Sequence, residues 1–484
     1  MARGTLVLLM GINLFNYIDR QILSAVLWRL QLDGTMFVPT DKAVQFKLGL
    51  LTSAFLVSFM LVCPVAGWLD SRGYRRWTVI GVGVTVWSLG SGATGLVVGY
   101  WGLLALRCLV GVGEAAYGPV ASALLADAYP PARRGTVMAG FNLAIPVGSA
   151  LGFVLGGVVS DYHDDWRPAF WVTFAGLGLG LLCFLVKEMP RPASVSVSTG
   201  YWGDLRRLRR TRSFVLCCAG MTPVIFVLGG LAAWVPTYIL QRESRFVLTL
   251  DGLDEMADSS RHVGARVLPP GVLTKLRPQA DGVERTLPDL KRHVGDALTP
   301  GETALYLEHI VAATSTPGSP RMGTVGVVFG GIVVLGGVVG TIMGAWLGHR
   351  LKARVRGAYF FVSGVGALFA LPCFVLFLYS PLPLGWLWVF LSVIGMFLHT
   401  GPAFTLIANV TRPHTRATAF AVNSLVVHAL GDVLSPPLIG AVADAWNLQT
   451  AFLLTSVMIA IGAVFWFGGM RTLDADTADI NEPE

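Results

Sequence analysis

The chain has 484 residues, of which 54% are hydrophobic and 13% are charged, and its formal net charge is +7. Soluble globular proteins contain about 25% charged residues, so this composition excludes a water-soluble fold. The basic residues form short clusters between apolar runs rather than one polar face, and this distribution excludes a nucleic-acid-binding surface.

Apolar runs recur along almost the whole chain, and many approach the ~20 residues that an α-helix needs to cross a bilayer. They predict an all-α membrane protein with twelve transmembrane helices. The first run begins almost at the N-terminus and shows no small-residue cleavage site, so we expect a permanent first helix. The predicted helices lie near residues 5–28, 47–70, 77–99, 101–126, 135–160, 167–186, 213–240, 322–348, 357–379, 385–410, 416–442 and 448–470.

These helices divide into six, a basic link and six. We predict an N-terminal six-helix bundle at 1–186, a cytoplasmic link at 187–212, a C-terminal six-helix bundle at 213–470 and a cytoplasmic tail at 471–484. With the N-terminus in the cytoplasm, the clusters of Arg and Lys between helices all fall on the cytoplasmic side. The positive-inside rule therefore predicts that both termini are cytoplasmic.

The connection between the seventh and eighth helices, residues 241–321, is polar, mixed in charge and too long for an ordinary loop. We expect a small non-cytoplasmic appendage that is partly helical around Glu302–Ala313. The sequence does not indicate its role.

The six-plus-six organisation is typical of transporters that hold their substrate between two related bundles near the middle of the bilayer. Ionisable side chains inside such helices are costly, so each one is a candidate for function. The first helix carries Asp19 and Arg20, and the fourth carries Arg107 and Glu114. At about 1.5 Å per residue, Asp19 lies about 21 Å above the cytoplasmic end of its helix, well inside the hydrocarbon.

Arg107 and Glu114 are seven residues apart and therefore share one face of the fourth helix. Two acids and two arginines can then form one polar cluster in a central cavity. Burial raises the proton affinity of a carboxylate and a nearby arginine lowers it, so protonation can switch the ion pairs of a proton-coupled carrier. The alternative is a static salt bridge that joins the first helix to the fourth.

In the C-terminal half, His399 and His428 lie within predicted helices, and Asp432 lies one turn after His428. A histidine can titrate near neutral pH, but an isolated one is more often a packing residue, which is our interpretation of His399. The six cysteines lie in or at the ends of apolar runs without metal-ligand spacing, so we expect no metal site.

Four blocks of sequence and one loop form a pattern together. The blocks are Asn16–Arg20, Arg107–Ala115, Ala144–Gly152 and His428–Gly440, and the loop is Asp70–Arg76. The blocks resemble those of the spinster-like transporters of the major facilitator superfamily. The loop resembles in outline the acid-x-x-Gly-x-basic-basic loop of that superfamily, although Ala66 replaces a usual glycine and the matching loop after the eighth predicted helix has no acid.

The resemblance implies a major facilitator fold and proton-linked transport of a lysolipid, such as a lysophospholipid or a sphingosine phosphate. It implies that Asp19 and Glu114 are proton-sensitive carboxylates and that Arg20 and Arg107 bind those acids or the lipid headgroup. It also implies polar cavity contacts at His428 and Asn142 and gating residues at Asp70, Arg72, Arg75 and Asp432. A merely basic turn is the alternative for the Asp70 loop.

Two other functions stay open on the sequence alone: a major facilitator carrier of a small organic anion such as a sugar acid, and, more remotely, a membrane-embedded enzyme or receptor. No glycine pair precedes the Gly-Lys-Ser or Gly-Lys-Thr of a nucleotide-binding loop, so we expect no ATP and no other cofactor. The expected partners are an amphiphilic substrate, protons and the bilayer. We expect a monomer in a bacterial inner membrane.

Overall fold

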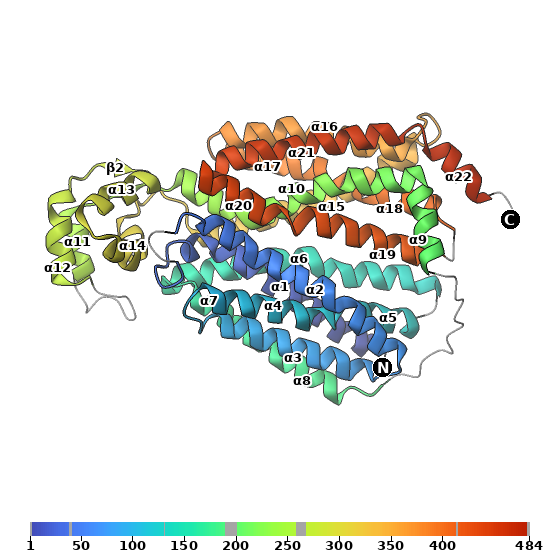
Figure 1. Ribbon diagram of the computed structural model, residues 1–484, viewed down its shortest axis with the longest axis horizontal. Helices are drawn as coiled ribbons and strands as arrows, with labels where there is room; N and C mark the ends of the chain where they lie inside the picture. Colours follow the sequence, from blue (N-terminus) through green and yellow to red (C-terminus); the bar gives the residue numbers. More distant parts are fainter. Residues whose placement is uncertain are drawn as a thin grey trace. The chain divides into compact units, whose positions relative to one another are not determined.

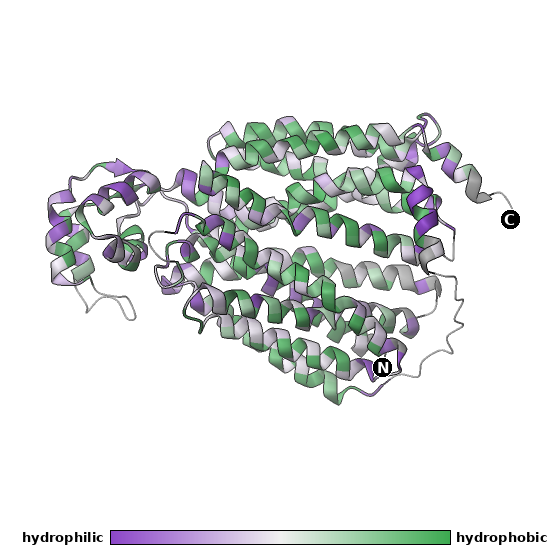
Figure 2. Ribbon diagram, in the orientation of Figure 1, coloured by the Kyte–Doolittle hydropathy of each residue, from purple (hydrophilic) through white to green (hydrophobic). Residues whose placement is uncertain are grey.

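The computed structural model describes residues 2–37, 41–129, 131–188, 201–257, 268–412 and 415–481. Helices make up most of these residues, and many of them are long rods (Figure 1). Colouring by hydropathy shows the rods to be mainly apolar, whereas the basic link helix α9 is strongly polar (Figure 2). This distribution is expected where lipid, not water, surrounds the helices.

The first six predicted spans are all present, and two of them contain breaks. Spans one to three are single helices, the fourth is divided near Ala116, and the sixth contains a short 3-10 turn. The elements are α1 (Ala2–Leu30), α2 (Val44–Ser71), α3 (Arg76–Thr94), α4 (Tyr100–Ala115), α5 (Gly118–Ala128), α6 (Pro131–His163), α7 (Arg167–Trp171), η1 (Val172–Ala175) and α8 (Gly176–Leu185).

The second six spans are also present. A π-helical turn, η3 (His428–Asp432), interrupts the eleventh span, and such turns occur frequently at functional sites. The remaining helices outside the appendage are α9 (Tyr201–Arg210), α10 (Arg212–Glu243), α15 (Met322–Leu351), α16 (Ala358–Tyr379), α17 (Leu384–Phe397), α18 (Thr400–Asn409), α19 (Arg416–Val427), α20 (Ser435–Ala445), α21 (Leu448–Gly469) and α22 (Leu473–Asn481).

Ten helical stretches among the described residues are long and apolar enough to cross a membrane by length and composition alone. The two other predicted spans, α1 and α3, are less apolar. Asn16, Asp19 and Arg20 lower the hydropathy of α1, and α3 is rich in Gly, Ser and Thr. Both helices contribute to a buried polar cluster, so their polarity reflects the site that they build.

The chain forms two compact units. The first contains Met1–Leu125, Pro131–Lys187 and Ala233–Gly330, and the second contains Ala126–Pro130, Glu188–Ala232 and Gly331–Glu484. The ends of α10 and α15 that flank the appendage thus belong to the first unit. The division at 187–212 into an N-terminal and a C-terminal six-helix bundle stays a prediction.

Within the first unit, α1 packs along α6, while α2 and α3 pack against α4. Within the second unit, α16 packs against α17 and α21, with the rings of Phe360, Phe374, Phe452 and Trp466 buried between the helices. Dispersion contacts between closely packed side chains hold such interfaces together, because lipid removes the usual hydrophobic driving force between helices.

The appendage predicted at 241–321 is a small helical domain. Its helix α14 begins with a capping box, in which Thr299 and Glu302 satisfy each other's backbone amides, and this confirms the helix predicted around Glu302–Ala313. The elements are β1 (Phe246–Val247), α11 (Leu250–Ala257), α12 (Pro270–Leu276), η2 (Arg277–Gln279), β2 (Glu284–Arg285), α13 (Leu287–Ala297) and α14 (Pro300–Thr314), with β1 antiparallel to β2.

Candidate functional site

The four ionisable residues predicted from the first and fourth spans all lie in the first unit. Asp19 and Arg20 are on α1, and Arg107 and Glu114 are on α4. Asp19, Arg107 and Glu114 are no more than 2% exposed. Three charged groups removed so completely from water require direct polar partners, because an isolated buried charge is strongly unfavourable.

Arg20 and Glu114 form a direct ion pair. The Nε and Nη2 atoms of Arg20 lie 2.8 Å and 2.7 Å from Oε2 of Glu114. The guanidinium also lies over the rings of Tyr17 and Phe55, each 4.9 Å from the ring centroid, and over Phe59 at 5.4 Å. Aromatic faces attract a cation, so these rings stabilise the position of the Arg20 guanidinium. The Arg20 side chain nevertheless remains 22% exposed.

Asp19 and Arg107 are connected through α3. The hydroxyl of Ser91 donates to Oδ1 of Asp19, and Nη2 of Arg107 lies 3.4 Å from the Ser91 oxygen. The same Nη2 donates to Oγ1 of Thr94 at 2.9 Å, and the guanidinium lies 5.3 Å from the ring centroid of Phe170. The expected cluster therefore consists of two parts. Arg20 and Glu114 form a direct ion pair, and Ser91 connects Asp19 to Arg107.

Ser91 and Thr94, which are equally buried, were not among the residues predicted from the sequence. Their spacing of three residues places both hydroxyls on one face of α3, and this is the signal that could have identified them. That signal is weak, because serine and threonine in apolar helices often bond only to their own backbone.

Two glycines allow the close approach of helices that builds the cluster. A Cβ atom on Gly111 would lie 2.3 Å from the carbonyl oxygen of Phe55 on α2. A Cβ atom on Gly113 would lie 2.6 Å from the backbone nitrogen of Trp87 on α3. Any larger residue at either position would push α4 away from α2 or α3, so these glycines of the Arg107–Glu114 block allow α4 to pack closely against both helices.

Each of the three most buried members of the cluster has a polar atom without a hydrogen-bond partner among the described residues. These atoms are Oδ2 of Asp19, Nε of Arg107 and Oε1 of Glu114. A buried polar atom left without a partner costs about 1–3 kcal/mol, so each of these atoms is expected to bind a proton, a water molecule or a ligand. Two carboxylate oxygens without donors are suitable acceptors for protons.

The loop between α2 and α3 is held by its acid and two of its arginines. Arg76 contacts Asp70 through Nε, 2.7 Å from Oδ1, and through Nη2, 3.1 Å from Oδ2. Arg75 donates to the carbonyl oxygen of Val186, just after α8, at 2.6 Å. Arg72 lies over the ring of Trp68. The partner of Asp70 is therefore Arg76, which is not among the predicted gating residues.

His428 and Asp432 form a pair in the π-helical turn of the second unit. Nδ1 of His428 lies 2.9 Å from Oδ2 of Asp432, and the His428 side chain is 46% exposed. On α10, a Cβ atom at Gly229 would lie 2.5 Å from Cβ of Asp432, so α10 approaches this turn closely. The two residues predicted as a cavity contact and a gating group thus interact directly.

The remaining candidates differ in how they are placed. His399 is 3% exposed, its Nδ1 lies 2.5 Å from the carbonyl oxygen of Met396, and its ring packs near Trp466. These contacts agree with the packing role interpreted for it. Asn142 lies on α6, but its side chain is outside the described residues. In the described part of the chain, His, Cys, Asp and Glu form no group of three or more that could hold a metal ion.

Comparisons with known proteins agree with this architecture. The family model described as Major Facilitator Superfamily matches residues 9–252. Protein spinster homolog 3 of Danio rerio is 31% identical over 446 residues, which are 90% of this chain and 75% of that protein. Protein spinster homolog 1 of Homo sapiens is 30% identical over 493 residues, with 96% and 80% of the two chains covered.

Solved structures show the same fold. A bacterial homolog of the human lysosomal transporter Spinster, in an inward-facing and unoccupied conformation, has a TM-score of 0.71 at 20% identity, with 98% of each chain covered. A D-xylose-proton symporter has a TM-score of 0.59 at 15% identity, with 96% of each chain covered. The chain is therefore a multi-pass membrane protein of the major facilitator superfamily, with twelve helices in two bundles, and it belongs to the spinster family of transporters, which are not enzymes.

Proposed function

We propose that this transporter moves a lysolipid-like amphiphile by alternating access and couples that movement to protons. The observation that carries the proposal is the buried cluster of α1, α3 and α4, in which Asp19 and Glu114 each keep one oxygen without a hydrogen-bond donor among the described residues. A purely structural salt bridge would use both oxygens, because each unsatisfied buried atom is costly.

Protons act, in this proposal, by releasing arginines. An ionised Glu114 holds Arg20 through a direct ion pair, and an ionised Asp19 holds Arg107 through Ser91. Protonation of either carboxylate removes its negative charge and weakens that hold. The arginine is then available to another anion. The spare oxygen of each acid provides the place where the proton binds.

The substrate contact that fits this geometry best is Arg20. It is the member of the cluster that retains appreciable exposure, and Tyr17, Phe55 and Phe59 surround its charged group with aromatic rings. A guanidinium can bind a phosphate or carboxylate through two hydrogen bonds, and apolar neighbours can contact an acyl chain. This combination suits an anionic headgroup attached to a hydrocarbon better than a fully water-soluble substrate.

Substrate and proton binding are linked through the Arg20–Glu114 contact. A headgroup that binds Arg20 displaces Glu114, and a displaced carboxylate buried to this extent is unfavourable unless it takes up a proton. Anion and proton therefore enter the site together, and the net charge of the cluster does not change. We assign His428 to a polar contact in the other half of the transporter, and Asp432 and the Asp70 loop, with Arg72 and Arg75, to gating.

A transport panel in proteoliposomes tests this proposal. Purified full-length protein is assayed for uptake of a lysophospholipid, sphingosine phosphate and a sugar acid, with and without an imposed proton gradient. We expect gradient-stimulated uptake of the lysolipids and none of the sugar acid. Uptake of the sugar acid alone would replace the amphiphile with a small organic anion, and lysolipid uptake that ignores the gradient in both directions would remove proton coupling.

A further inference from the structure

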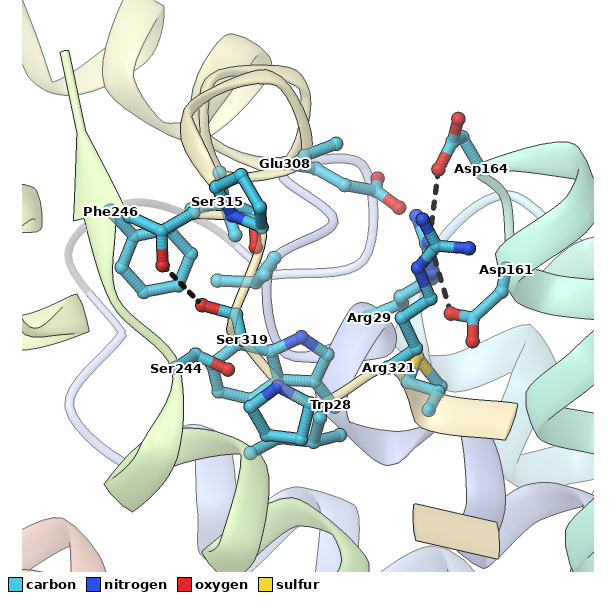
Figure 3. Close-up of a pocket in the computed structure, with 18 residues that line it drawn as sticks. Trp28, Arg29, Asp161, Asp164, Ser244, Phe246, Glu308, Ser315, Ser319 and Arg321 are labelled. Atoms are coloured by element: carbon cyan, nitrogen blue, oxygen red, sulfur yellow. Dashed lines mark hydrogen bonds and ion pairs between the residues drawn. The ribbon is translucent and has the colours of Figure 1, made fainter. Parts of the chain in front are cut away.

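A second polar site lies in the first unit, between the appendage and the helix ends beside it. It is a cavity of about 510 Å³, within the range of about 300–1,000 Å³ that is usual for pockets that bind small molecules. Figure 3 shows the charged groups gathered on one side of this cavity and the rings of Trp28 and Phe246 on the other. The charged residues that line it are Arg29, Asp161, Asp164, Glu308 and Arg321.

The charges around the cavity do not cancel. Nη2 of Arg29 lies 3.0 Å from Asp164 and 3.6 Å from Asp161, so this arginine already forms ion pairs with two carboxylates. Arg321 is exposed to solvent, which screens its charge. When Glu308 on α14, the remaining carboxylate, is ionised, three acids against two arginines leave one negative charge in excess.

Glu308 is the unusual member of this set. Its Oε1 atom is buried and has no hydrogen-bond partner among the described residues, and its carboxylate points into the charged side of the cavity (Figure 3). A carboxylate oxygen that folding leaves buried without a donor is expected to receive one from elsewhere, either a proton or a cationic ligand.

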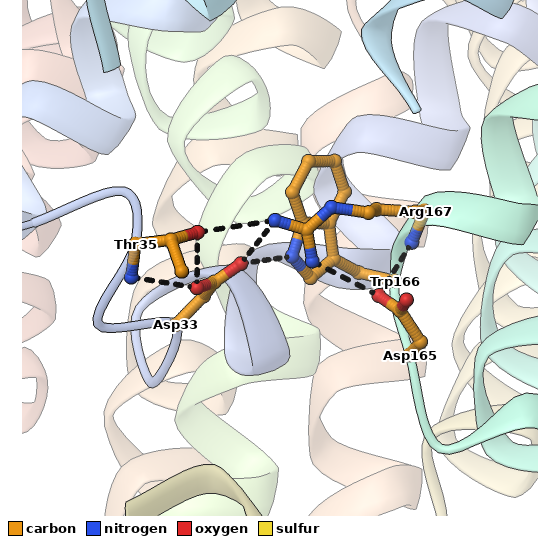
Figure 4. A network of polar contacts seen from close by, with 5 residues as sticks. All are labelled: Asp33, Thr35, Asp165, Trp166 and Arg167. Carbon is orange, nitrogen blue, oxygen red and sulfur yellow. Dashed lines mark hydrogen bonds and ion pairs between the residues drawn. The ribbon is translucent and has the colours of Figure 1, made fainter. Parts of the chain in front are cut away.

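The charged groups around Glu308 determine how a proton and a cationic ligand compete for its carboxylate. Burial, with the nearby carboxylates of Asp33 and Asp165, raises the pKa of Glu308 to about 8, although Arg29 and Arg167 oppose this rise. Figure 4 shows Arg167 bound to both Asp33 and Asp165, with Nη2 of Arg167 2.9 Å from Oδ2 of Asp33. Asp161 and Asp164 add further negative charge from the end of α6.

We propose that this cavity is a binding site for an ammonium group, with Glu308 as its counter-ion. A cation with N–H donors would satisfy the unpartnered oxygen of Glu308, and any ammonium ion, methylated or not, would balance the charge of the ionised acids. The ring of Trp28, on the other side of the cavity, suits a ligand that carries such a group, because aromatic rings attract ammonium ions. The site shares no residue with the buried cluster of α1 and α4. The proposal therefore goes beyond the proposed function, and it can be tested independently of that function.

The ammonium group can belong to a free alkylammonium ion or to the headgroup of an amphiphile. Isothermal titration calorimetry of the full-length protein in lipid nanodiscs distinguishes the two sources, with tetramethylammonium and dodecyltrimethylammonium as probes and dodecyl phosphate as the anionic comparison. Binding of both cations indicates that the ammonium group suffices. Binding of dodecyltrimethylammonium alone indicates that an attached chain is required.

Competition with a proton supplies a readout that a structural role for Glu308 would not produce. With a pKa of about 8, the ionised fraction of Glu308 is about tenfold higher at pH 9 than at pH 7, so the apparent Kd should fall by about tenfold over this interval. Glu308→Gln should abolish saturable binding at pH 9, whereas Glu308→Asp should restore part of it. Asp296→Asn, an exposed change on α13, serves as the matched control.

Three results would overturn the proposal. If neither cation binds wild-type protein at pH 9, or if Glu308→Gln binds as tightly as wild type and Asp296→Asn do, Glu308 is not the counter-ion. The wild-type pH series does not depend on the folding of any variant. An affinity that is equal at pH 7 and pH 9 would therefore also reject the site.

Discussion

Nη2 of Arg20 lies 2.7 Å from Oε2 of Glu114, and this contact connects α1 to α4 across 94 positions of sequence. The partner of the buried acid is thus an arginine that is itself partly accessible. Because Glu114 is buried and Arg20 is partly exposed, a ligand can break this ion pair only by binding to Arg20. From this asymmetry, together with the separate contacts through Ser91, we expect the two acids to bind protons and the two arginines to bind an anion.

Glu114→Gln should make lysolipid uptake independent of an imposed proton gradient while exchange of labelled for unlabelled substrate continues. The amide can still accept a hydrogen bond from Arg20 but cannot take up a proton. Uptake and exchange in the same proteoliposomes measure the two activities. Asp251→Asn, an exposed change in the appendage, is the control, and gradient-dependent uptake that survives in Glu114→Gln would exclude Glu114 from coupling.

Asp19→Asn should abolish the pH dependence of transport and leave the protein folded, because the amide keeps the shape of the side chain that Ser91 contacts. Ser91→Ala, which removes the bridge between Asp19 and Arg107, should weaken the pH dependence without eliminating it. Size-exclusion chromatography and circular dichroism check folding. Wild-type pH dependence in Asp19→Asn would remove Asp19 from the proposed role.

Arg20→Ala should weaken binding of a phosphate-bearing lysolipid more than binding of a neutral amphiphile. A hydrogen bond to a charged group contributes about 1.5–3 kcal/mol, which corresponds to a loss of about 10- to 100-fold in affinity. We expect the same selective loss in Arg107→Ala, because Arg107 becomes accessible to the headgroup once Asp19 is protonated. Calorimetry with both lipids measures the difference, and an equal loss for the two lipids would indicate a structural role for that arginine.

Arg76→Ala should alter the rate of transport more than the affinity for substrate, because it breaks the contacts with Asp70 that hold the loop between α2 and α3. The initial rate of uptake and its half-saturating substrate concentration separate the two effects. Arg354→Ala removes an exposed arginine from another loop and should behave as wild type. A rise in the half-saturating concentration at unchanged maximal rate would contradict a gating role.

Asp33→Asn should destabilise the protein by about 1–3 kcal/mol at pH 7. Burial alone would raise the pKa of Asp33, but hydrogen bonds from Thr35 and Trp166, with the charge of Arg167, hold it below its usual range. A lowered pKa in the folded state means that this stabilisation is present above pH ~4 and is lost as the pH falls through the folded value. Thermal unfolding of both proteins from pH 3 to pH 7 should therefore show a difference in midpoint that shrinks toward the acid end.

Hydropathy and the spacing of basic residues were sufficient to predict twelve spans, because each span must satisfy its backbone hydrogen bonds alone and must be apolar over a length set by the bilayer. Both requirements act on contiguous residues, so they are visible along the chain. The same local cost of burying charge identified Asp19, Arg20, Arg107 and Glu114 as candidate functional residues. The family was predicted from the sequence blocks around these residues together with the blocks Ala144–Gly152 and His428–Gly440.

The pairing within that cluster could not be read from the chain. Which arginine meets which acid depends on the rotation of α1, α3 and α4 about their axes, and contacts such as Gly111 against Phe55 set those rotations. Ser91 became part of the site only because α3 places it between Asp19 and Arg107. Glu308 likewise acquires its unusual environment from residues more than a hundred positions away, since burial and electrostatic surroundings are properties of the folded chain and not of local sequence.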